Sequence, residues 1–199
     1  MSVDRAVLRR ELRTRRGLLA ASERIAAAER LASRLLDLPF APGSGYVAGY
    51  WAMDGEIALH AWQLKLPREC IYCLPVLVGE RLHFAPWRPG DALASNQFGV
   101  PEPDVAASSL LDAQQMALVV APLVGFDDRG HRLGMGGGWY DRSFAFRQQQ
   151  PPPPWLVGAA FDIQRIDALE TAPWDVTLDA VCTESTFHDC QAFSAASPA

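Results

Sequence analysis

The sequence contains almost no lysine: Lys65 is the single lysine among its 18 basic residues, and all the others are arginines. A binding site for an anion must therefore use arginine side chains or backbone N–H groups. The positive charge is also concentrated, because residues 1–36 carry nine arginines against four acidic residues, which is +5. The rest of the chain must then carry −10 to give the net charge of −5, and this acidic bulk argues against a nucleic-acid partner.

Long apolar segments are absent too. No run approaches the ~20 apolar residues of a membrane helix, and the N-terminal arginines precede no apolar segment of the kind that a secretory signal contains. We therefore expect no membrane association and a cytoplasmic location. A length of 199 residues with 49% hydrophobic content suits one domain with a substantial core. We expect this domain over residues 1–190, a disordered tail over residues 191–199, and a monomer.

The four cysteines form no metal-binding pattern. Cys70 and Cys73 have the spacing of a zinc site, but they lie in a strand-like segment, where residues three apart point to opposite faces. Cys182 and Cys190 supply no second pair at that spacing. We therefore predict buried free thiols in a reducing compartment.

Several common catalytic motifs are missing. A P-loop requires Gly-Lys-Ser/Thr, but here Gly138 is followed by Trp139, and the glycines from Gly134 onward do not match the dinucleotide pattern Gly-x-Gly-x-x-Gly. No Gly-x-Ser-x-Gly elbow occurs, and the four histidines have no recognisable nucleophile partner. These absences exclude the usual nucleotide fingerprints and argue against serine or cysteine hydrolase chemistry.

A glycine-rich stretch, residues 125–142, is the most informative part of the chain. It follows the apolar run 116–124 and precedes residues 140–150, which lack glycine and proline, so the order strand, glycine loop, helix is predicted. Glycines let successive backbone N–H groups face an anion, and a helix adds its positive end. Arg132 and Asp141 flank the glycines and favour a phosphate with Mg²⁺, which binds phosphates and carboxylates together. The alternative is a flexible connection with an exposed arginine and aspartate.

The rest of the chain alternates helical and strand patterns, which indicates an α/β fold. The expected helices cover residues 5–13, 22–38 and 57–66, and the expected strands cover residues 46–51, 71–78, 81–86 and 155–161. In the second helix, Ile25, Ala28, Leu31, Ala32, Leu35 and Leu38 have the spacing of a core face.

The first helix carries two kinds of arginine. Arg5 and Arg9 are four residues apart and therefore share one face. The other arginines of this segment are expected to form a solvated face. They are Arg10, Arg13, Arg15 and Arg16.

The glycine-rich stretch resembles the signature of a known enzyme family. Phe126-Asp127-x-x-Gly130 followed by Arg132-Leu133-Gly134-x-Gly136-Gly137-Gly138-x-Tyr140-Asp141 is similar to the motif of the 5-formyltetrahydrofolate cyclo-ligases, also called methenyltetrahydrofolate synthetases. The resemblance extends over residues 3–187. It implies a three-layer α/β/α domain with a mostly parallel central sheet. It also implies cyclisation of 5-formyltetrahydrofolate to 5,10-methenyltetrahydrofolate with ATP as co-substrate, Mg²⁺ as cofactor, and release of ADP and phosphate.

The resemblance assigns roles to particular residues. The residues implied in ATP binding are Arg5, Arg9, Arg132, Leu133, Gly134, Met135, Gly136, Gly137, Gly138, Trp139 and Tyr140. Those implied in folate binding are Trp51, Glu56, Met135, Gly136, Gly137, Gly138 and Trp139. Arg132 and Asp141 are the implied catalytic residues. Asp141 and Asp175 are the implied Mg²⁺ ligands, with Asp179 in reserve.

The chemistry of the folate residues fits those roles. An aromatic ring at Trp51 can stack on a flat heterocycle, and a carboxylate at Glu56 can accept two hydrogen bonds from an amino-pyrimidinone edge. Read without the resemblance, Glu56 is an acid at a helix N-terminus. Phe98 and Glu102 are further candidates for the pocket wall, and their alternative is an ordered loop rich in proline and glycine.

Two positions depart from the family pattern: Arg5 stands where lysine is usual, and Trp174 stands where histidine is usual. Arginine keeps the positive charge, so ATP binding is expected to survive. Two other readings of the chain stay open. One is a non-catalytic nucleotide- or folate-binding homologue, and the other is an ATP-dependent enzyme that acts on a related substrate.

Overall fold

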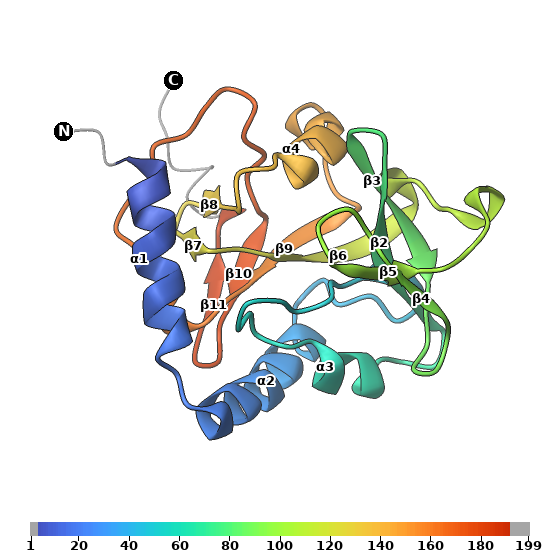
Figure 1. The fold of residues 1–199 in the computed structure, drawn as a ribbon, viewed down its shortest axis with the longest axis horizontal. Helices are drawn as coiled ribbons and strands as arrows, with labels where there is room; N and C mark the ends of the chain where they lie inside the picture. The colour runs from blue at the N-terminus through green and yellow to red at the C-terminus, as the bar shows by residue number, and fades with distance from the viewer. Residues whose placement is uncertain (1–3, 192–199) are drawn as a thin grey trace.

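A computed structural model describes residues 4–191, which are built around a seven-stranded sheet (Figure 1). The strand order is β11-β10-β9-β6-β1-β2-β3. The strands are β1 (Gly45–Ala48), β2 (Cys70–Val78), β3 (Arg81–Pro86), β6 (Met116–Pro122), β9 (Trp155–Ala159), β10 (Ala180–Cys182) and β11 (Phe187–Asp189). The five central strands run parallel, and the two edge strands are antiparallel to their neighbours. The predicted α/β fold with a mostly parallel sheet is confirmed.

Apolar runs explain why the central strands are buried on both faces. Along β6, Leu118 and Val120 face one hydrophobic cluster, and Val119 between them faces another. Strands of a parallel sheet covered on both sides have this continuous apolar sequence, because alternate residues point to opposite faces. The two thiols of Cys70 and Cys73 also belong to different clusters, and all four cysteines are free, as predicted.

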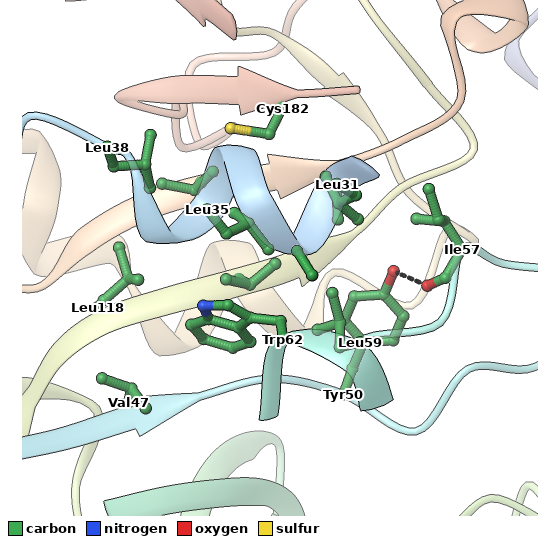
Figure 2. Packing of buried hydrophobic residues seen from close by; sticks show 14 of the residues in the cluster. Leu31, Leu35, Leu38, Val47, Tyr50, Ile57, Leu59, Trp62, Leu118 and Cys182 are labelled. Atoms are coloured by element: carbon green, nitrogen blue, oxygen red, sulfur yellow. Dashed lines mark hydrogen bonds between the residues drawn. The ribbon is translucent and has the colours of Figure 1, made fainter. Parts of the chain in front are cut away.

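Helices cover the two faces of the sheet (Figure 1). The α-helices are α1 (Arg5–Gly17), α2 (Ala21–Leu36), α3 (His60–Lys65) and α4 (Trp139–Ser143). Helices α2 and α3 pack on one face, and α4 with the 3₁₀ turn η3 (Ala145–Gln148) lies on the other. Figure 2 shows Leu31 and Leu35 of α2 and Trp62 of α3 beside Val47 and Leu118 of the sheet.

Helix α1 packs beside the sheet, against a small cluster of its own. Leu12 is fully buried with Val124, Leu133 and Leu169. The helix begins at Asp4, whose carboxylate accepts a hydrogen bond from the N–H of Ala6 at 2.8 Å. This N-cap satisfies one of the N–H groups that the first turn leaves unpaired.

Two short hairpins and three 3₁₀ turns lie outside the main sheet. The hairpin β4 (Leu93–Ser95) with β5 (Pro101–Pro103) and the hairpin β7 (Gly125–Phe126) with β8 (Arg132–Leu133) are small separate sheets. The 3₁₀ turns η1 (Ala107–Ser109), η2 (Ala113–Gln115) and η4 (Asp162–Gln164) connect other elements. Of the predicted tail, all but residue 191 lies outside the described residues. None of the helices in residues 4–191 has the length and apolar character that crossing a membrane requires.

Local predictions differ from the structure in three places. The third helix begins only at His60, and residues 140–150 form the short α4 and then η3 in place of one helix. Phe144, between them, is buried in the core, so tertiary packing overrides the helical pattern there. Ile25 is 68% exposed, because the buried stripe of α2 is formed by Ala27, Leu31, Ala32 and Leu35 and Ile25 lies off that stripe.

Candidate active site

A pocket of about 890 Å³ opens at the carboxyl ends of β1 and β6. From β1 the chain proceeds to β2 and β3 on one side, and from β6 it proceeds to β9 and β10 on the other. These two neighbouring strands therefore mark the switch point of the sheet, where α/β proteins bind their ligands. Tyr50 and Trp51 follow β1, and Pro122 and Leu123 lie at the end of β6; all four line the pocket.

The glycine loop lies between β8 and α4 and forms one wall. Gly138 has φ of 65°, a left-handed conformation that favours glycine, and it is the N-cap of α4. The Nε of Arg9 donates to the carbonyl oxygen of Gly134 at 2.7 Å, which joins α1 to the loop. Since α4 has only five residues, its dipole adds less than the longer helix predicted from the sequence would, and the arginines supply the main positive charge.

Two ion pairs lie at one end of the pocket. Arg132 donates to Oδ1 of Asp141 at 2.8 Å, and the N–H of Val176 donates to the same oxygen at 3.0 Å. Arg5 donates to Oδ2 of Asp175 at 3.1 Å, and that oxygen also accepts a bond from the N–H of Ala172. This end therefore combines two guanidinium groups with two carboxylates, all of which line the pocket.

The two carboxylates fit a cation that is shared with phosphate oxygens. Oδ2 of Asp141 and Oδ1 of Asp175 accept no hydrogen bond from residues 4–191, so each keeps one oxygen for a ligand. Mg²⁺ commonly binds one or two carboxylates together with substrate phosphates. Within the described part of the chain, no cluster of three or more histidine, cysteine, aspartate or glutamate side chains could hold a metal ion alone. The donor set therefore suits Mg²⁺ that arrives with a phosphorylated ligand.

Asp179 does not belong to this site. It is buried away from the pocket, where Arg147 and Gln191 donate to one carboxylate oxygen and the N–H of Leu156 donates to the other at 2.7 Å. Its reserve role as a Mg²⁺ ligand is therefore corrected: both oxygens are used in joining η3 and β9 to the loop before β10.

Glu56 and Trp51 also line the pocket. The Glu56 carboxylate accepts a hydrogen bond from the N–H of Met53 at 3.0 Å, which closes a tight turn. Burial raises the pKa of Glu56. Trp51 contacts Trp87 edge to face, with ring centroids 5.7 Å apart, so its ring is braced at the pocket wall.

Tyr140 supplies an unpaired polar group. Its hydroxyl oxygen is buried and has no hydrogen-bond partner among residues 4–191, although the residue lines the pocket. Burial raises the pKa of this phenol, so it stays a neutral donor. The guanidinium of Arg132 lies 5.5 Å from the centre of the ring. A buried hydroxyl without a partner marks a place where a ligand oxygen can bind.

Most residues singled out from the sequence line this one pocket. They are Arg5, Arg9, Trp51, Glu56, Phe98, Glu102, Arg132, Gly134, Met135, Gly136, Gly137, Gly138, Trp139, Tyr140, Asp141 and Asp175. Besides Asp179, Leu133 is an exception, because it is fully buried against Leu12 and does not line the pocket. A direct ATP contact through its side chain is therefore not supported.

Sequence reasoning missed other members of the wall. Tyr50 and Asn96 line the pocket, and Arg142 lies over the ring of Trp139 at 4.9 Å from its centre. Trp174 lines the pocket while 70% exposed.

Arg16, predicted to face solvent, is 1% exposed. Its position four residues after Leu12, on the same helix face, was the signal that could have revealed this burial.

The fold and the pocket define the class of the protein: an α/β enzyme whose site lies at the switch point of its sheet. Within that class the chain belongs to the 5-formyltetrahydrofolate cyclo-ligase family, whose profile matches residues 1–184. The resemblance carried by the glycine loop is thereby confirmed.

Relatives and solved structures agree with this membership. The chain is 34% identical to the 5-formyltetrahydrofolate cyclo-ligase of Haemophilus influenzae, over 87% of this chain and 94% of that protein. It is 32% identical to the Escherichia coli K12 protein of the same name, over 87% and 97%. The NMR structure of Aquifex aeolicus 5,10-methenyltetrahydrofolate synthetase superposes with a TM-score of 0.79 at 27% identity, over 94% of this chain and 93% of that one. The Mycoplasma pneumoniae synthetase, 22% identical with a TM-score of 0.70 over 92% and 99%, shares the fold.

Proposed function

We propose that the protein catalyses the ATP-dependent cyclisation of 5-formyltetrahydrofolate to 5,10-methenyltetrahydrofolate, with release of ADP and phosphate. One observation carries the proposal: a single pocket gathers the glycine loop, the arginine and aspartate pairs, and the Trp51–Glu56 wall. The first two suit a nucleoside triphosphate with Mg²⁺, and the third suits a pterin. The names of the relatives support the same reaction.

The order of contacts along α1 supports the placement of the two substrates. Arg5 contacts Asp175, Arg9 contacts the glycine loop, and Arg16 contacts the turn before Glu56. At 1.5 Å per residue, Arg5 and Arg16 are about 16 Å apart along the helix. We place the phosphates of ATP at the Arg5 end, the pterin at the Glu56 end, and the reacting groups at the glycine loop between them.

The reaction needs activation of a poor leaving group. The formyl group on N5 is an amide, and its oxygen does not leave readily. Transfer of the γ-phosphoryl group of ATP to that oxygen releases ADP and converts the oxygen into part of a phosphate ester. The neighbouring aryl nitrogen then attacks the formyl carbon, loses its proton, and displaces phosphate, which carries the former formyl oxygen away. The balance needs no other reactant.

The chain contributes position and charge to these steps. Arg9, Arg132 and the backbone N–H groups of the glycine loop hold the transferring phosphoryl group, and both substrates are fixed within one pocket. Arg132 can exchange its bond with Asp141 for bonds to phosphate oxygens, because guanidinium forks match phosphate well. Bound Mg²⁺, held by Asp141 and Asp175, would neutralise phosphate charge. The neutral hydroxyl of Tyr140 is a donor for a ligand oxygen.

At the folate end, Glu56 accepts two hydrogen bonds from the amino-pyrimidinone edge when it is ionised. Trp51 provides a flat apolar surface for the pterin ring. We further propose a cytoplasmic monomer; the four free cysteines support a reducing compartment. Sedimentation or size-exclusion measurement of the purified protein tests the monomer.

The test of the proposed reaction is direct. Purified protein is mixed with 5-formyltetrahydrofolate and MgATP, and the near-ultraviolet absorbance of the methenyl product is followed, with controls that omit ATP or Mg²⁺. Absorbance growth that requires both is expected. An unchanged absorbance, with both ligands still binding, would instead favour a non-catalytic binding homologue or an enzyme that acts on a related substrate.

A further inference from the structure

Arg16 is a buried arginine that bonds to the pocket wall from outside. Its Nη2 donates to the carbonyl oxygen of Asp54 at 3.0 Å, and its Nη1 donates to that of Leu123 at 3.4 Å. Its Nε is buried and has no partner among residues 4–191. Both accepting residues line the pocket, whereas Arg16 does not. Burial of a charge is costly, so an arginine at this position indicates a role that an apolar side chain would not fill.

The turn held by Arg16 has an unfavourable backbone conformation. Asp54 has φ of 49° and Gly55 has φ of 76°, so both central residues of the turn Met53–Glu56 are left-handed, as in a type I′ turn. Asp54 is the single non-glycine residue with positive φ in the described part of the chain. Such a conformation persists where neighbouring groups hold it, and it occurs often at ligand sites.

Neighbouring contacts hold both ends of this turn. Directly after the turn, the Tyr50 hydroxyl donates to the carbonyl oxygen of Ile57 at 2.6 Å, as Figure 2 shows. Within the turn, Arg16 joins the Asp54 backbone to the end of β6 in the protein interior. Arg13 also contacts Asp54, but that ion pair joins two side chains that are about half exposed. Arg16 is thus the interior attachment of the turn at Asp54, and Tyr50 holds the segment beyond Glu56.

Leu123 would stay in place without Arg16. The side-chain amide of Gln164 donates to the carbonyl oxygens of Leu123 and Val124 at 2.9 and 3.0 Å. Loss of the guanidinium therefore releases the turn but leaves the end of β6 attached. The effect of a substitution at Arg16 is expected to concentrate on the Glu56 end of the pocket.

We propose that Arg16 is a positioning residue: it fixes the Met53–Glu56 turn so that the Glu56 carboxylate faces the substrate. This inference rests on the proposed function, because it takes Glu56 as the group that binds the pterin. Charge acts in the same direction as geometry. The positive charge of Arg16 opposes the effect of burial on the pKa of Glu56 and so favours the ionised acceptor. The other groups that act on Glu56 or respond to it are the Met53 N–H, Arg13, Asp54, Tyr50 and Tyr140.

The test compares Arg16→Met and Arg16→Lys with Arg13→Met, a control on the same helix that contacts the same turn through an exposed side chain. Initial rates give KM for 5-formyltetrahydrofolate and for MgATP. Arg16→Met is expected to raise the folate KM about tenfold and to leave kcat and the ATP KM within about twofold, since a charged hydrogen bond to the turn is lost. Arg16→Lys keeps the charge and one bond, so an intermediate folate KM is expected, and Arg13→Met is expected to match the unmodified protein.

The outcomes separate this inference from the proposed function. An inactive unmodified protein contradicts the proposed function, whereas an active one whose Arg16→Met variant keeps its folate KM contradicts the inference. A parallel rise of both KM values shows a displaced α1 and also overturns it. If Arg16→Met does not fold, Arg16→Lys decides: a raised folate KM alone supports the proposal, and unchanged kinetics overturn it.

The pH dependence of folate kcat/KM is a further measurement, which a merely structural role of Arg16 would not change. For Arg16→Met, the acid limb of the folate kcat/KM profile is expected to move to higher pH, because Glu56 loses a neighbouring positive charge. For Arg16→Lys the limb is expected to stay near its original position. An unmoved limb in a folded Arg16→Met protein would contradict the action of Arg16 on Glu56.

Discussion

Four aspartates have basic partners, but they differ in whether the second oxygen of the carboxylate also accepts a hydrogen bond. Asp141 and Asp175 line the pocket, and each keeps one carboxylate oxygen without a hydrogen bond from residues 4–191. Asp127 and Asp179 lie outside the pocket, and both oxygens of each accept hydrogen bonds. An ion pair alone therefore does not identify a functional carboxylate. An oxygen left without a partner beside a pocket is the better sign, because it has capacity for a ligand.

The largest effect is expected at Asp141, where a substitution tests the pocket side of this comparison. Asp141→Asn removes the counter-charge of Arg132 and a charged ligand of the proposed Mg²⁺ site, so kcat/KM is expected to fall by about 10²–10³. The asparagine oxygen can still accept from the N–H of Val176, but the buried guanidinium of Arg132 loses its counter-charge, so the rate is measured per folded molecule. Initial rates at limiting Mg²⁺ provide the measurement. An unimpaired rate there would remove Asp141 from the metal site.

The framework side of the comparison is tested at Asp179. Asp179→Asn leaves the buried guanidinium of Arg147 without its counter-charge, and breaking such a pair costs about 3 kcal/mol of unfolding free energy. Activity per folded molecule is expected to stay within about twofold, because Asp179 does not line the pocket. Urea unfolding and active-site titration measure the two quantities. A stable but inactive variant would contradict the assignment.

Asp175 is expected to show a smaller effect of the same kind as Asp141. Its partner Arg5 is partly exposed and remains free to bind phosphate when the carboxylate is lost. Asp175→Asn is therefore expected to raise the KM for MgATP about tenfold and to lower kcat less than Asp141→Asn does. Arg5→Lys serves as the matched control for the charge of the pair. A changed folate KM with an unchanged ATP KM would place Asp175 at the wrong end of the pocket.

The smallest free-energy change is expected for the stability of a variant at Glu56, which lines the pocket and forms no ion pair with residues 4–191. Since burial raises its pKa, the ionised acceptor is lost as pH falls through a value above the usual glutamate range, and folate kcat/KM should fall there. The free energy of unfolding changes in the opposite direction. Because the folded state binds this proton more tightly than the unfolded state does, lowering the pH through that range increases the free energy of unfolding. Glu56→Gln should remove the acid limb of the folate kcat/KM profile. It should also raise the free energy of unfolding at neutral pH by less than about 1 kcal/mol. A pH series of rates and unfolding curves checks both.

Sequence reasoning selected residues that line one pocket wherever local spacing carried the information. The glycine loop is one continuous motif, and Arg5 with Arg9 needs only the helical period to share a face. The parallel strands β1, β2, β6 and β9 were predicted from their apolar sequences, whereas the three-residue β10 was not. These features depend on near neighbours in the chain, so they are readable without a structure.

Other features depend on distant parts of the chain and could not be read in this way. The burial of Arg16 follows from the helix face that it shares with Leu12, but its acceptors at residues 54 and 123 lie far away in the chain. Asp179 is excluded from the pocket because Arg147 and Leu156 take its oxygens. The short α4 likewise ends where Phe144 enters the core. Long-range packing decided these cases against the local pattern.

The scarcity of lysine has a practical consequence for work with this protein. Apart from the α-amino group, Lys65 is the only amine, and it lies on α3, partly exposed and paired with Glu29 of α2. Reagents directed at amines therefore have one side chain to modify, and it does not line the pocket. The cations of the pocket are guanidinium groups, which such reagents leave intact. A dye or a sensor surface coupled through the Lys65 side chain would leave the side chains of the pocket unmodified.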